Sequence, residues 1–198
     1  MRREAGVRAL VARVTDEPII ANLGPATADL FAAGDRDANL YSFGGMGLVS
    51  SIGLGVALAA PDRRVYVTDG DGSLLMNLGS LATIALMRAA NLVLIVWDNH
   101  QWAETGGQPT HTASGTDLAG IAIAAGIPRV ASVSTIEAFE ESLDAAARED
   151  GPWCIVADVE EHGRAPRPRV NMEENLLRFR RTFGKGAALD PLAGADRV

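Results

Sequence analysis

Two groups of polar side chains that could bind a metal ion follow apolar segments of this chain. The first is Asp69-Gly70-Asp71-Gly72-Ser73 and the second is Asp98-Asn99-His100-Gln101. Where a strand passes into a helix through glycines, the backbone N–H groups of the turn attract an anion such as a diphosphate. Asp71 would repel a bare phosphate, so the pairing is favourable only if a hard cation such as Mg²⁺ lies between them. The residue types therefore indicate a diphosphate bound through a metal ion.

The interval between the two groups indicates that they meet. The 25 residues from 73 to 97 suffice for one helix and one buried strand, which return the chain to the same edge of a parallel sheet. Asn99 then offers a neutral amide oxygen beside Asp71. An alternative remains open at this point, namely a glycine-rich turn with a capping aspartate in an ordinary nucleotide-binding fold.

Apolar runs and helical periodicities alternate along most of the chain. The continuous apolar run at 91–97 is typical of a strand that is buried on both faces. The predicted strands are 18–23, 64–68, 91–97, 130–133 and 153–159, and the predicted helices are 3–14, 27–33, 48–60, 74–90, 118–125 and 135–148. The alternation predicts a single α/β domain, a doubly wound parallel sheet with helices on both faces. Gly53 and Gly55 are expected to let the helix at 48–60 approach the sheet closely.

The alternation stops near residue 161, so we expect a domain over residues 1–161 and an appendage over 162–198. Three Arg and two Pro between 162 and 170 predict an extended linker. Residues 171–183 are predicted to form a short basic helix, and the last fifteen residues to be disordered or draped on the surface. The basic helix could pack on its own domain or bind a partner subunit.

The composition is that of a soluble globular protein. The chain has 198 residues, 47% of them hydrophobic, and a formal net charge of −7. This charge argues against general attraction to nucleic acid. We find no signal peptide and no apolar run near the roughly 20 residues that span a bilayer. The single cysteine, Cys154, lies in an apolar run and is predicted to be buried, so we expect a cytoplasmic protein that binds neither nucleic acid nor membranes.

Gly70-Asp71-Gly72, followed at this interval by Asp98-Asn99, resembles the metal motif of the thiamine diphosphate enzymes, in which Gly-Asp-Gly is followed by Asn-Asn. Asp98 stands in place of the first Asn. The resemblance implies thiamine diphosphate bound through Mg²⁺. Asp71 and Asn99 would bind the metal through their side chains and Gln101 through its backbone carbonyl. Gly72 and Ser73 would donate to the diphosphate. The further cofactor contacts that the resemblance implies in these two regions and at the end of the first strand are Gly24, Gly70, Trp102 and Ala103.

The run Gly44-Gly45-Met46-Gly47 resembles a second motif of the same family. By this resemblance the carbonyl of Gly44 accepts a hydrogen bond from the aminopyrimidine, Gly45 lies beside it, and Met46 wedges beneath the thiazolium. On its residue type alone, Met46 could equally fill a gap in the core before a buried helix.

Within the family, the chain is most similar to the sulfopyruvate and phosphonopyruvate decarboxylases. The similar segments are Gly45–Leu48 with Ser50–Gly55, Asp69–Ile84 and Gly107–Thr110, within a resemblance that runs from about residue 18 to residue 160. It implies the diphosphate-binding subunit of a split 2-oxo acid decarboxylase.

In this family the activating Glu lies on a pyrimidine-binding domain, and the chain begins almost at the first strand of the diphosphate domain. We therefore expect it to be inactive without a separate pyrimidine-domain subunit, in an α₂β₂-like or larger assembly. No catalytic residue is assigned with certainty in this chain.

The polar loop from His100 to Thr116 is expected to face the substrate. Glu104 and His111 are the candidate catalytic side chains, although a solvated loop histidine is an equal alternative for His111. The expected substrate is a short 2-oxo acid related to sulfopyruvate or phosphonopyruvate. Glu104 would disfavour a doubly charged phosphonate, which leaves the exact substrate open. Two other functions stay open: an acyloin-forming carboligase subunit and a non-catalytic nucleotide-binding module.

Overall fold

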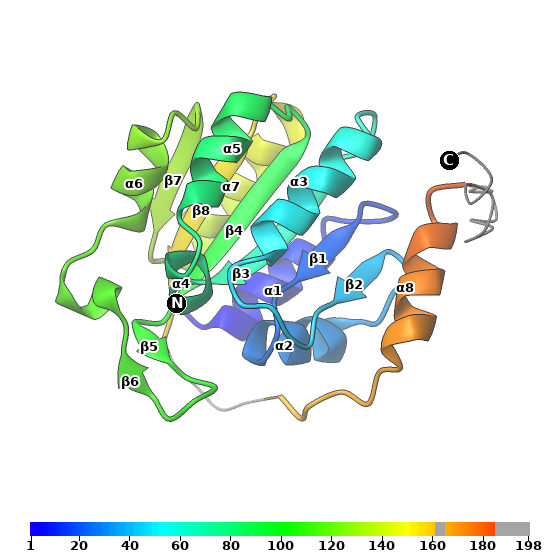
Figure 1. Ribbon diagram of the computed structural model, residues 1–198, viewed down its shortest axis with the longest axis horizontal. Helices are drawn as coiled ribbons and strands as arrows, with labels where there is room; N and C mark the ends of the chain where they lie inside the picture. The colour runs from blue at the N-terminus through cyan, green and yellow to red at the C-terminus, as the bar shows by residue number, and fades with distance from the viewer. Residues whose placement is uncertain (161–164, 185–198) are drawn as a thin grey trace, which may run out of the picture.

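Six parallel strands form the central sheet of the computed structural model, which describes residues 1–160 and 165–184 (Figure 1). The strand order is β2-β1-β3-β4-β8-β7. The strands are β1 (Ile19–Ala21), β2 (Asn39–Tyr41), β3 (Val65–Gly70), β4 (Leu92–Asp98), β7 (Arg129–Val133) and β8 (Trp153–Asp158). The predicted parallel sheet is confirmed. The predictions for residues 162–164 of the linker and 185–198 of the tail lie outside the described residues.

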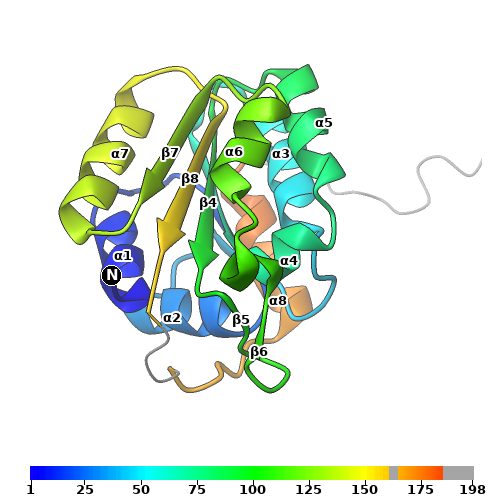
Figure 2. The same cartoon turned by 90° about the vertical axis from the view of Figure 1, so that its left-hand side faces the viewer.

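Helices cover both faces of the sheet, as the edge-on view shows (Figure 2). One face carries α1 (Arg3–Val11), α2 (Pro25–Ala33) and α7 (Ile136–Arg148). The other carries α3 (Val49–Ala59), α4 (Asp71–Leu75), α5 (Gly79–Met87) and α6 (Leu118–Ala124). The fold is therefore doubly wound, as predicted. No helix in the described ranges is long and apolar enough to span a membrane.

The sequence of strand β4 is continuously apolar because both of its faces are buried. Val93, Ile95 and Trp97 face one hydrophobic core, while Leu92, Leu94 and Val96 face the other. Side chains alternate between the faces of a strand, and here both faces are covered by helices. Cys154 on the neighbouring strand β8 is fully buried, as predicted.

The two glycines of α3 differ in their surroundings. A Cβ on Gly53 would lie 2.0 Å from Val67 Cγ2, so this glycine does permit close packing of α3 on β3. Gly55 has no atom within 4 Å of such a Cβ, and it faces outward. The expectation of close approach was therefore right for Gly53 and wrong for Gly55, because the helical period carries the two positions to opposite sides.

The predicted helix at 74–90 is two helices. Helix α4 begins directly at Asp71, where the sequence indicated a turn, and a break at residues 76–78 separates it from α5. Within the break the Asn77 amide donates to Gly47 O at 2.9 Å. The tertiary contact with the Gly47 loop thus replaces a continuous helix.

Four further short elements were not predicted. Strand β2 has only three residues, too few to show an alternating pattern. The loop at 98–116 contains an antiparallel ribbon of β5 (Gln101–Trp102) and β6 (Gln108–Pro109), followed by a 3-10 turn (His111–Ser114). Such short pieces form through contacts with the body and carry little periodicity of their own.

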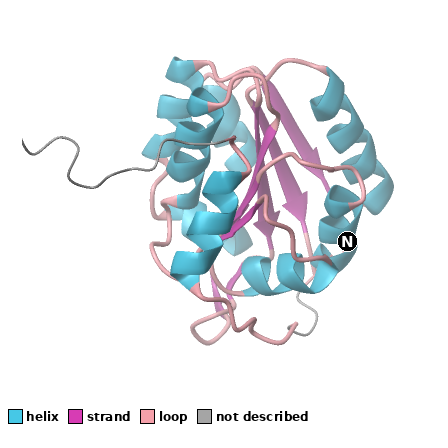
Figure 3. Ribbon diagram, turned by 90° about the vertical axis from the view of Figure 1, so that its right-hand side faces the viewer, coloured by secondary structure: helices cyan, strands magenta, loops and turns pink. Residues whose placement is uncertain are grey.

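Helix α8 (Met172–Arg181), predicted for residues 171–183, packs along edge strand β2 (Figure 3). The buried amide of Asn175 accepts from Tyr41 N at 3.0 Å and donates to Asn39 O at 2.8 Å. Arg178 pairs with Asp35 at 3.1 Å. The Asn175 side chain thus hydrogen-bonds one backbone N–H and one backbone C=O of the edge strand, and α8 packs against the domain.

The chain direction across the sheet reverses between β1 and β3. From β1 the chain proceeds to β2 on one side, whereas β3 is followed by β4 on the other. Asn22 N donates to Thr68 O, so the ends of these two strands lie at the same level. In doubly wound sheets the crevice at such a reversal is the usual ligand site.

Candidate functional site

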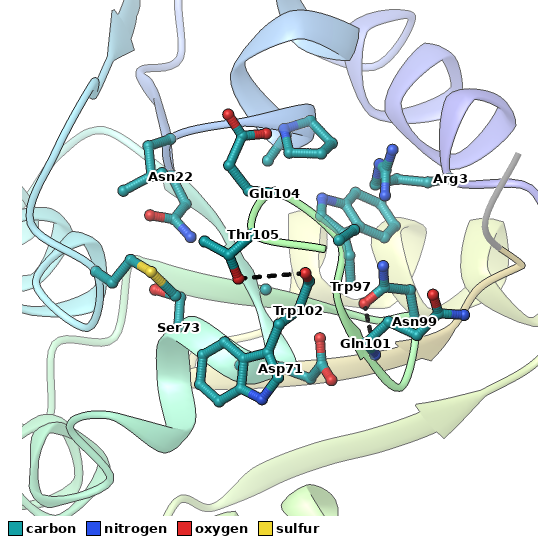
Figure 4. A pocket seen from close by; sticks show the side chains of 17 residues that line it. Arg3, Asn22, Asp71, Ser73, Trp97, Asn99, Gln101, Trp102, Glu104 and Thr105 are labelled. Carbon is teal, nitrogen blue, oxygen red and sulfur yellow. Dashed lines mark hydrogen bonds between the residues drawn. The ribbon is translucent and has the colours of Figure 1, made fainter. Parts of the chain in front are cut away.

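A cavity of about 580 Å³, including the open space at its mouth, lies beyond the carboxyl ends of β1, β3 and β4 (Figure 4). Its lining comes from the start of α1, the end of β1 with the start of α2, the loop before α3, the β3–α4 junction and the end of β4 with the segment that follows it. The residues are Arg3, Asn22, Leu23, Pro25, Ala26, Met46, Gly70, Asp71, Gly72, Ser73, Trp97, Asn99, Gln101, Trp102, Ala103, Glu104 and Thr105.

Most of the site residues predicted from the sequence line this one cavity. They are Met46, Gly70, Asp71, Gly72, Ser73, Asn99, Gln101, Trp102, Ala103 and Glu104. Gly24, Gly44 and Gly45 are outside the lining but lie within two residues of it. His111 is exposed at the start of the 3-10 turn, also outside the lining. Of the two catalytic candidates, only Glu104 reaches the cavity.

The lining residues that sequence reasoning did not single out include Arg3, Pro25, Ala26 and Trp97. Arg3 is buried in α1 and its Nε lies 2.7 Å from Asp29 Oδ2 on α2. Nothing in the local pattern places the first turn of the opening helix at the strand ends. Trp97 ends a strand buried on both faces, so only the register of β4 decides where its ring points.

Asp71 is the buried acid at the centre of the cavity. Its Oδ2 accepts a hydrogen bond from Thr110 Oγ1 at 2.5 Å, and Thr112 Oγ1 lies 3.3 Å from the same oxygen. Burial raises the pKa of the Asp71 carboxyl, the Thr110 hydrogen bond lowers it, and the charge of Asp98 raises it again. Desolvation is the dominant cause, so this carboxylate would gain from a cation beside it.

The turn after β4 brings Asn99 and Gln101 to the same cavity. His100 has a φ of 60°, in the left-handed region, which bends the chain sharply at this point. Gln101 N donates to Asn99 Oδ1 at 3.3 Å, and His100 N donates to Asp98 Oδ1 at 3.1 Å. Figure 4 shows Asp71, Asn99 and Gln101 gathered on one side of the cavity.

Ser73 holds the Met46 loop against α4. Its Oγ accepts from Gly47 N at 2.9 Å. Burial raises the pKa of the nearby Asp69 carboxyl, and the interaction with Ser73 partly offsets this increase. Gly47 has a φ of 81°, and a Cβ there would lie 2.9 Å from Asn77 Cβ. The Ser73 hydroxyl is thus engaged within the protein, which leaves its backbone N–H in the first turn of α4 as the group that could meet an anion.

The family described as thiamine pyrophosphate enzyme, C-terminal TPP binding domain, matches residues 27–157. This range contains the β3–α4 junction, the turn after β4 and the Met46 loop. The chain belongs to the thiamine pyrophosphate enzymes. The predicted resemblance to this family is confirmed.

Curated relatives of similar length are beta subunits of sulfopyruvate decarboxylase. The chain is 44% identical over 141 residues to sulfopyruvate decarboxylase subunit beta of Methanocaldococcus jannaschii, covering 71% of this chain and 74% of that one. It is 37% identical to the same subunit of Methanococcus maripaludis, covering 88% and 92%. For phosphonopyruvate decarboxylase of Streptomyces viridochromogenes the identity is 37%, over 90% of this chain but only 45% of that one.

A solved structure shares the fold. It is a candidate thiamin diphosphate-dependent enzyme from Mycobacterium smegmatis, with a TM-score of 0.71 and 24% identity over 82% of this chain and 32% of that one. At this identity the likeness supports the thiamine pyrophosphate enzyme fold alone.

The donor set of the cavity fits a hard metal ion. Asp71, Asn99 and the backbone of Gln101 offer carboxylate, amide and carbonyl oxygens, the ligand types that Mg²⁺ takes. No cluster of three or more His, Cys, Asp or Glu suited to a metal occurs in the described part of the chain. Asp71, Asn99 and Gln101 supply three donors, so a metal here would complete an octahedral shell with other oxygens, such as those of a diphosphate.

Buried polar atoms beside the cavity also fit a polar ligand. Asn22 lines the cavity, and its Oδ1 is buried with no hydrogen-bond partner among the described residues. Asp69 Oδ2 is also buried without a hydrogen-bond partner among the described residues, and burial raises the pKa of Asp69 to about 7. Buried polar atoms of this kind usually have a partner, so a ligand group is a plausible one for Asn22.

Two side chains of the segment after β4 lie against glycines that were predicted to contact the cofactor. A Cβ on Gly72 would lie 2.7 Å from the Trp102 ring, and one on Gly24 would lie 3.3 Å from Glu104 Oε2. Figure 4 shows Trp102 beside Asp71 and Glu104 near the start of α2. Only glycine fits beneath Trp102, so this segment and the β3–α4 junction form one packed unit.

Proposed function

We propose that this chain is the diphosphate- and metal-binding subunit of a split thiamine diphosphate-dependent 2-oxo acid decarboxylase. The observation that carries the proposal is the shared cavity of Asp71, Asn99 and Gln101, which come from the ends of two neighbouring strands. The decarboxylase names of the relatives support the reaction class.

The chain's own residues would bind and orient the cofactor. Asp71 and Asn99 would hold Mg²⁺ through their side chains and Gln101 through its carbonyl, while the backbone of Gly72 and Ser73 would donate to the diphosphate. Met46, which Ser73 and Asn77 hold in place through Gly47, would set the bend of the cofactor. Bound thiamine diphosphate supplies the electron sink that a 2-oxo acid needs to lose its carboxylate as CO₂.

The substrate class follows from the relatives and from Glu104. Sulfopyruvate and phosphonopyruvate are short 2-oxo acids with a second anionic group. Glu104 lines the cavity and adds a negative charge, which opposes a doubly charged phosphonate more than a singly charged sulfonate. We therefore propose a sulfopyruvate-like substrate first and a phosphonopyruvate-like one second.

A separate pyrimidine-domain subunit would complete the site, in an α₂β₂-like or larger assembly. The chain covers nearly the whole of two beta subunits but less than half of two phosphonopyruvate decarboxylases. The remaining half of those longer chains corresponds to the proposed partner. The single cysteine is buried and unpaired, in agreement with a reducing compartment such as the cytoplasm.

Replacing Asp71 tests the proposal. Calorimetry would titrate thiamine diphosphate with Mg²⁺ into the full chain, alone and in complex with the product of the neighbouring gene. We expect binding with the partner present, and a loss of affinity of at least about 100-fold in Asp71→Ala, because a metal ligand is removed. Asp62→Ala, at an exposed position outside the cavity lining, serves as the matched control and should bind like the wild type.

Product analysis separates the remaining functions. The decarboxylase should release CO₂ and an aldehyde from the 2-oxo acid, whereas a carboligase would give an acyloin. A nucleotide-binding module would show no thiamine diphosphate binding and would tolerate Asp71→Ala. Unchanged cofactor affinity in Asp71→Ala would overturn the proposed metal site.

A further inference from the structure

Two threonines from the segment after β6 connect the carboxylates of Asp71 and Asp98. Thr110 Oγ1 donates to Asp71 Oδ2 at 2.5 Å. Thr112 Oγ1 lies 3.3 Å from the same oxygen and 2.7 Å from Asp98 Oδ1. The two hydroxyl oxygens are 2.9 Å apart, and both threonines are buried. We call Thr110 and Thr112 the threonine pair.

Counting protons assigns a direction to the two shortest of these contacts. A threonine hydroxyl has one proton, and an ionised carboxylate only accepts. Thr110 gives its proton to Asp71 Oδ2, and Thr112 gives its proton to Asp98 Oδ1, the nearer of its two carboxylate oxygens. His100 Nδ1, 3.0 Å from Thr112 Oγ1, donates to that hydroxyl in the tautomer protonated at Nδ1. Both contacts of the threonine pair with Asp71 fall on Oδ2 and none on Oδ1.

We propose that the threonine pair positions Asp71 so that only Oδ1 is offered to the cation. The inference rests on the proposed function, in which Asp71 is a metal ligand. Turning the carboxylate about its terminal bond would break the short Thr110 bond in a buried site, where an unmade hydrogen bond to a charged group is costly. The threonine pair therefore makes Asp71 a one-oxygen ligand.

A one-oxygen carboxylate favours Mg²⁺ over Ca²⁺. Mg²⁺ requires near-ideal octahedral geometry with short bonds, whereas Ca²⁺ accepts more oxygens and readily takes both oxygens of a carboxylate. Because Thr110 holds Oδ2 of Asp71, this second carboxylate oxygen is not offered to the cation. Releasing Oδ2 should thus weaken the Mg²⁺ site and shift its preference toward Ca²⁺, a change that a purely structural role would not produce.

Thr110→Val tests the inference because valine keeps the shape of threonine and removes the hydroxyl. Calorimetry on the complex with the pyrimidine-domain subunit would measure thiamine diphosphate affinity at a series of Mg²⁺ and, separately, Ca²⁺ concentrations. We expect Thr110→Val to weaken the apparent Mg²⁺ affinity about tenfold and to raise the Ca²⁺-to-Mg²⁺ affinity ratio. Thr110→Ser, which restores the hydroxyl, should return both values to those of the wild type.

Controls separate this inference from the proposed function and from misfolding. Thr116→Val, in the same segment but outside the threonine pair, should leave both affinities unchanged, and thermal unfolding without metal should show that each variant is folded. If the wild type does not bind thiamine diphosphate with Mg²⁺, the proposed function fails. If the wild type binds but Thr110→Val and Thr112→Val keep its Mg²⁺ affinity and metal preference, or Thr110→Ser does not rescue, the positioning role alone is overturned.

Discussion

Asp69 is a buried acid whose environment opposes ionisation. It is fully buried at the end of β3, where burial raises its pKa from 3.8 to about 7. Gly70 N donates to its Oδ1 at 2.8 Å, but its Oδ2 has no partner among the described residues. Burial therefore shifts the Asp69 carboxyl toward its neutral form, two residues before the proposed metal ligand.

The raised pKa of Asp69 makes stability depend on pH in a defined direction. Below about pH 4 the carboxyl is protonated in both the folded and the unfolded chain. Between that pH and about 7 only the unfolded chain loses the proton, so the contribution of Asp69 to the free energy of unfolding falls as pH rises, by at most about 4 kcal/mol.

Asp69→Asn should flatten this dependence, because the amide does not titrate. Chemical denaturation of the metal-free protein from pH 4.5 to 8, with EDTA present, would measure it. Asp62→Asn, an exposed control, should retain the slope of the wild type. An unchanged slope in Asp69→Asn would show that other groups cause the pH dependence.

At the scale of elements, α8 completes the sheet at its β2 edge. An exposed edge strand presents unpaired backbone groups that invite pairing with other chains. Asn175 satisfies one N–H and one C=O of β2, and Phe179 enters the core shared with α3 and α5. The Arg63 guanidinium lies 4.6 Å from the centre of the Phe183 ring and fastens the end of the helix. This helix is therefore part of the folded body.

Asn175→Ala should lower the free energy of unfolding by about 2–4 kcal/mol, because it leaves a buried donor and a buried acceptor of β2 unpaired. Asn171→Ala removes only the cap of α8, a bond of 2.9 Å to Glu174 N, and should cost about 1 kcal/mol. Urea denaturation of both variants would compare them. Equal losses in the free energy of unfolding would mean that the hydrogen bonds of Asn175 to β2 do not contribute more than a helix cap.

At the scale of the whole molecule, the body exposes apolar side chains on α3, on α5 and on the turn between α4 and α5. These residues define the α3–α5 face: Leu48, Ile52, Leu58, Met76, Leu86 and Met87. Both helices lie side by side on the viewer's side of Figure 1. Leu86 is 78% exposed, and large apolar side chains exposed on neighbouring elements are typical of an interaction surface. We expect the pyrimidine-domain subunit to bind here, close to Met46.

Leu86→Asp should weaken assembly with that subunit at least tenfold, since it places a charge in an apolar interface. Ile123→Asp is the matched control: Ile123 is 62% exposed on α6, outside the α3–α5 face. Light scattering on size-exclusion fractions of the co-expressed subunits would measure complex formation. Normal assembly of Leu86→Asp, together with loss of assembly in Ile123→Asp, would place the partner on the surface around α6 instead of the α3–α5 face.

The sequence by itself determined the fold class and most of the cavity. Strand and helix periods are local properties, and the 25-residue interval brings Asp71 and Asn99 to one sheet edge whatever the details of packing. Glycine-rich turns and buried strands are recognisable without a partner in space. For these reasons the lining residues from Gly70 to Ser73 and from Asn99 to Glu104 could be predicted.

Only the tertiary structure decided which distant segments meet these residues. Arg3 reaches the cavity because α1 packs on α2, and Thr110 reaches Asp71 because a short ribbon folds back over it. The break after α4 exists because Asn77 binds the Gly47 loop. Contacts between residues far apart in the chain depend on register and packing, which no local period encodes, and hence the hydrogen bonds that orient Asp71 had to be seen in three dimensions.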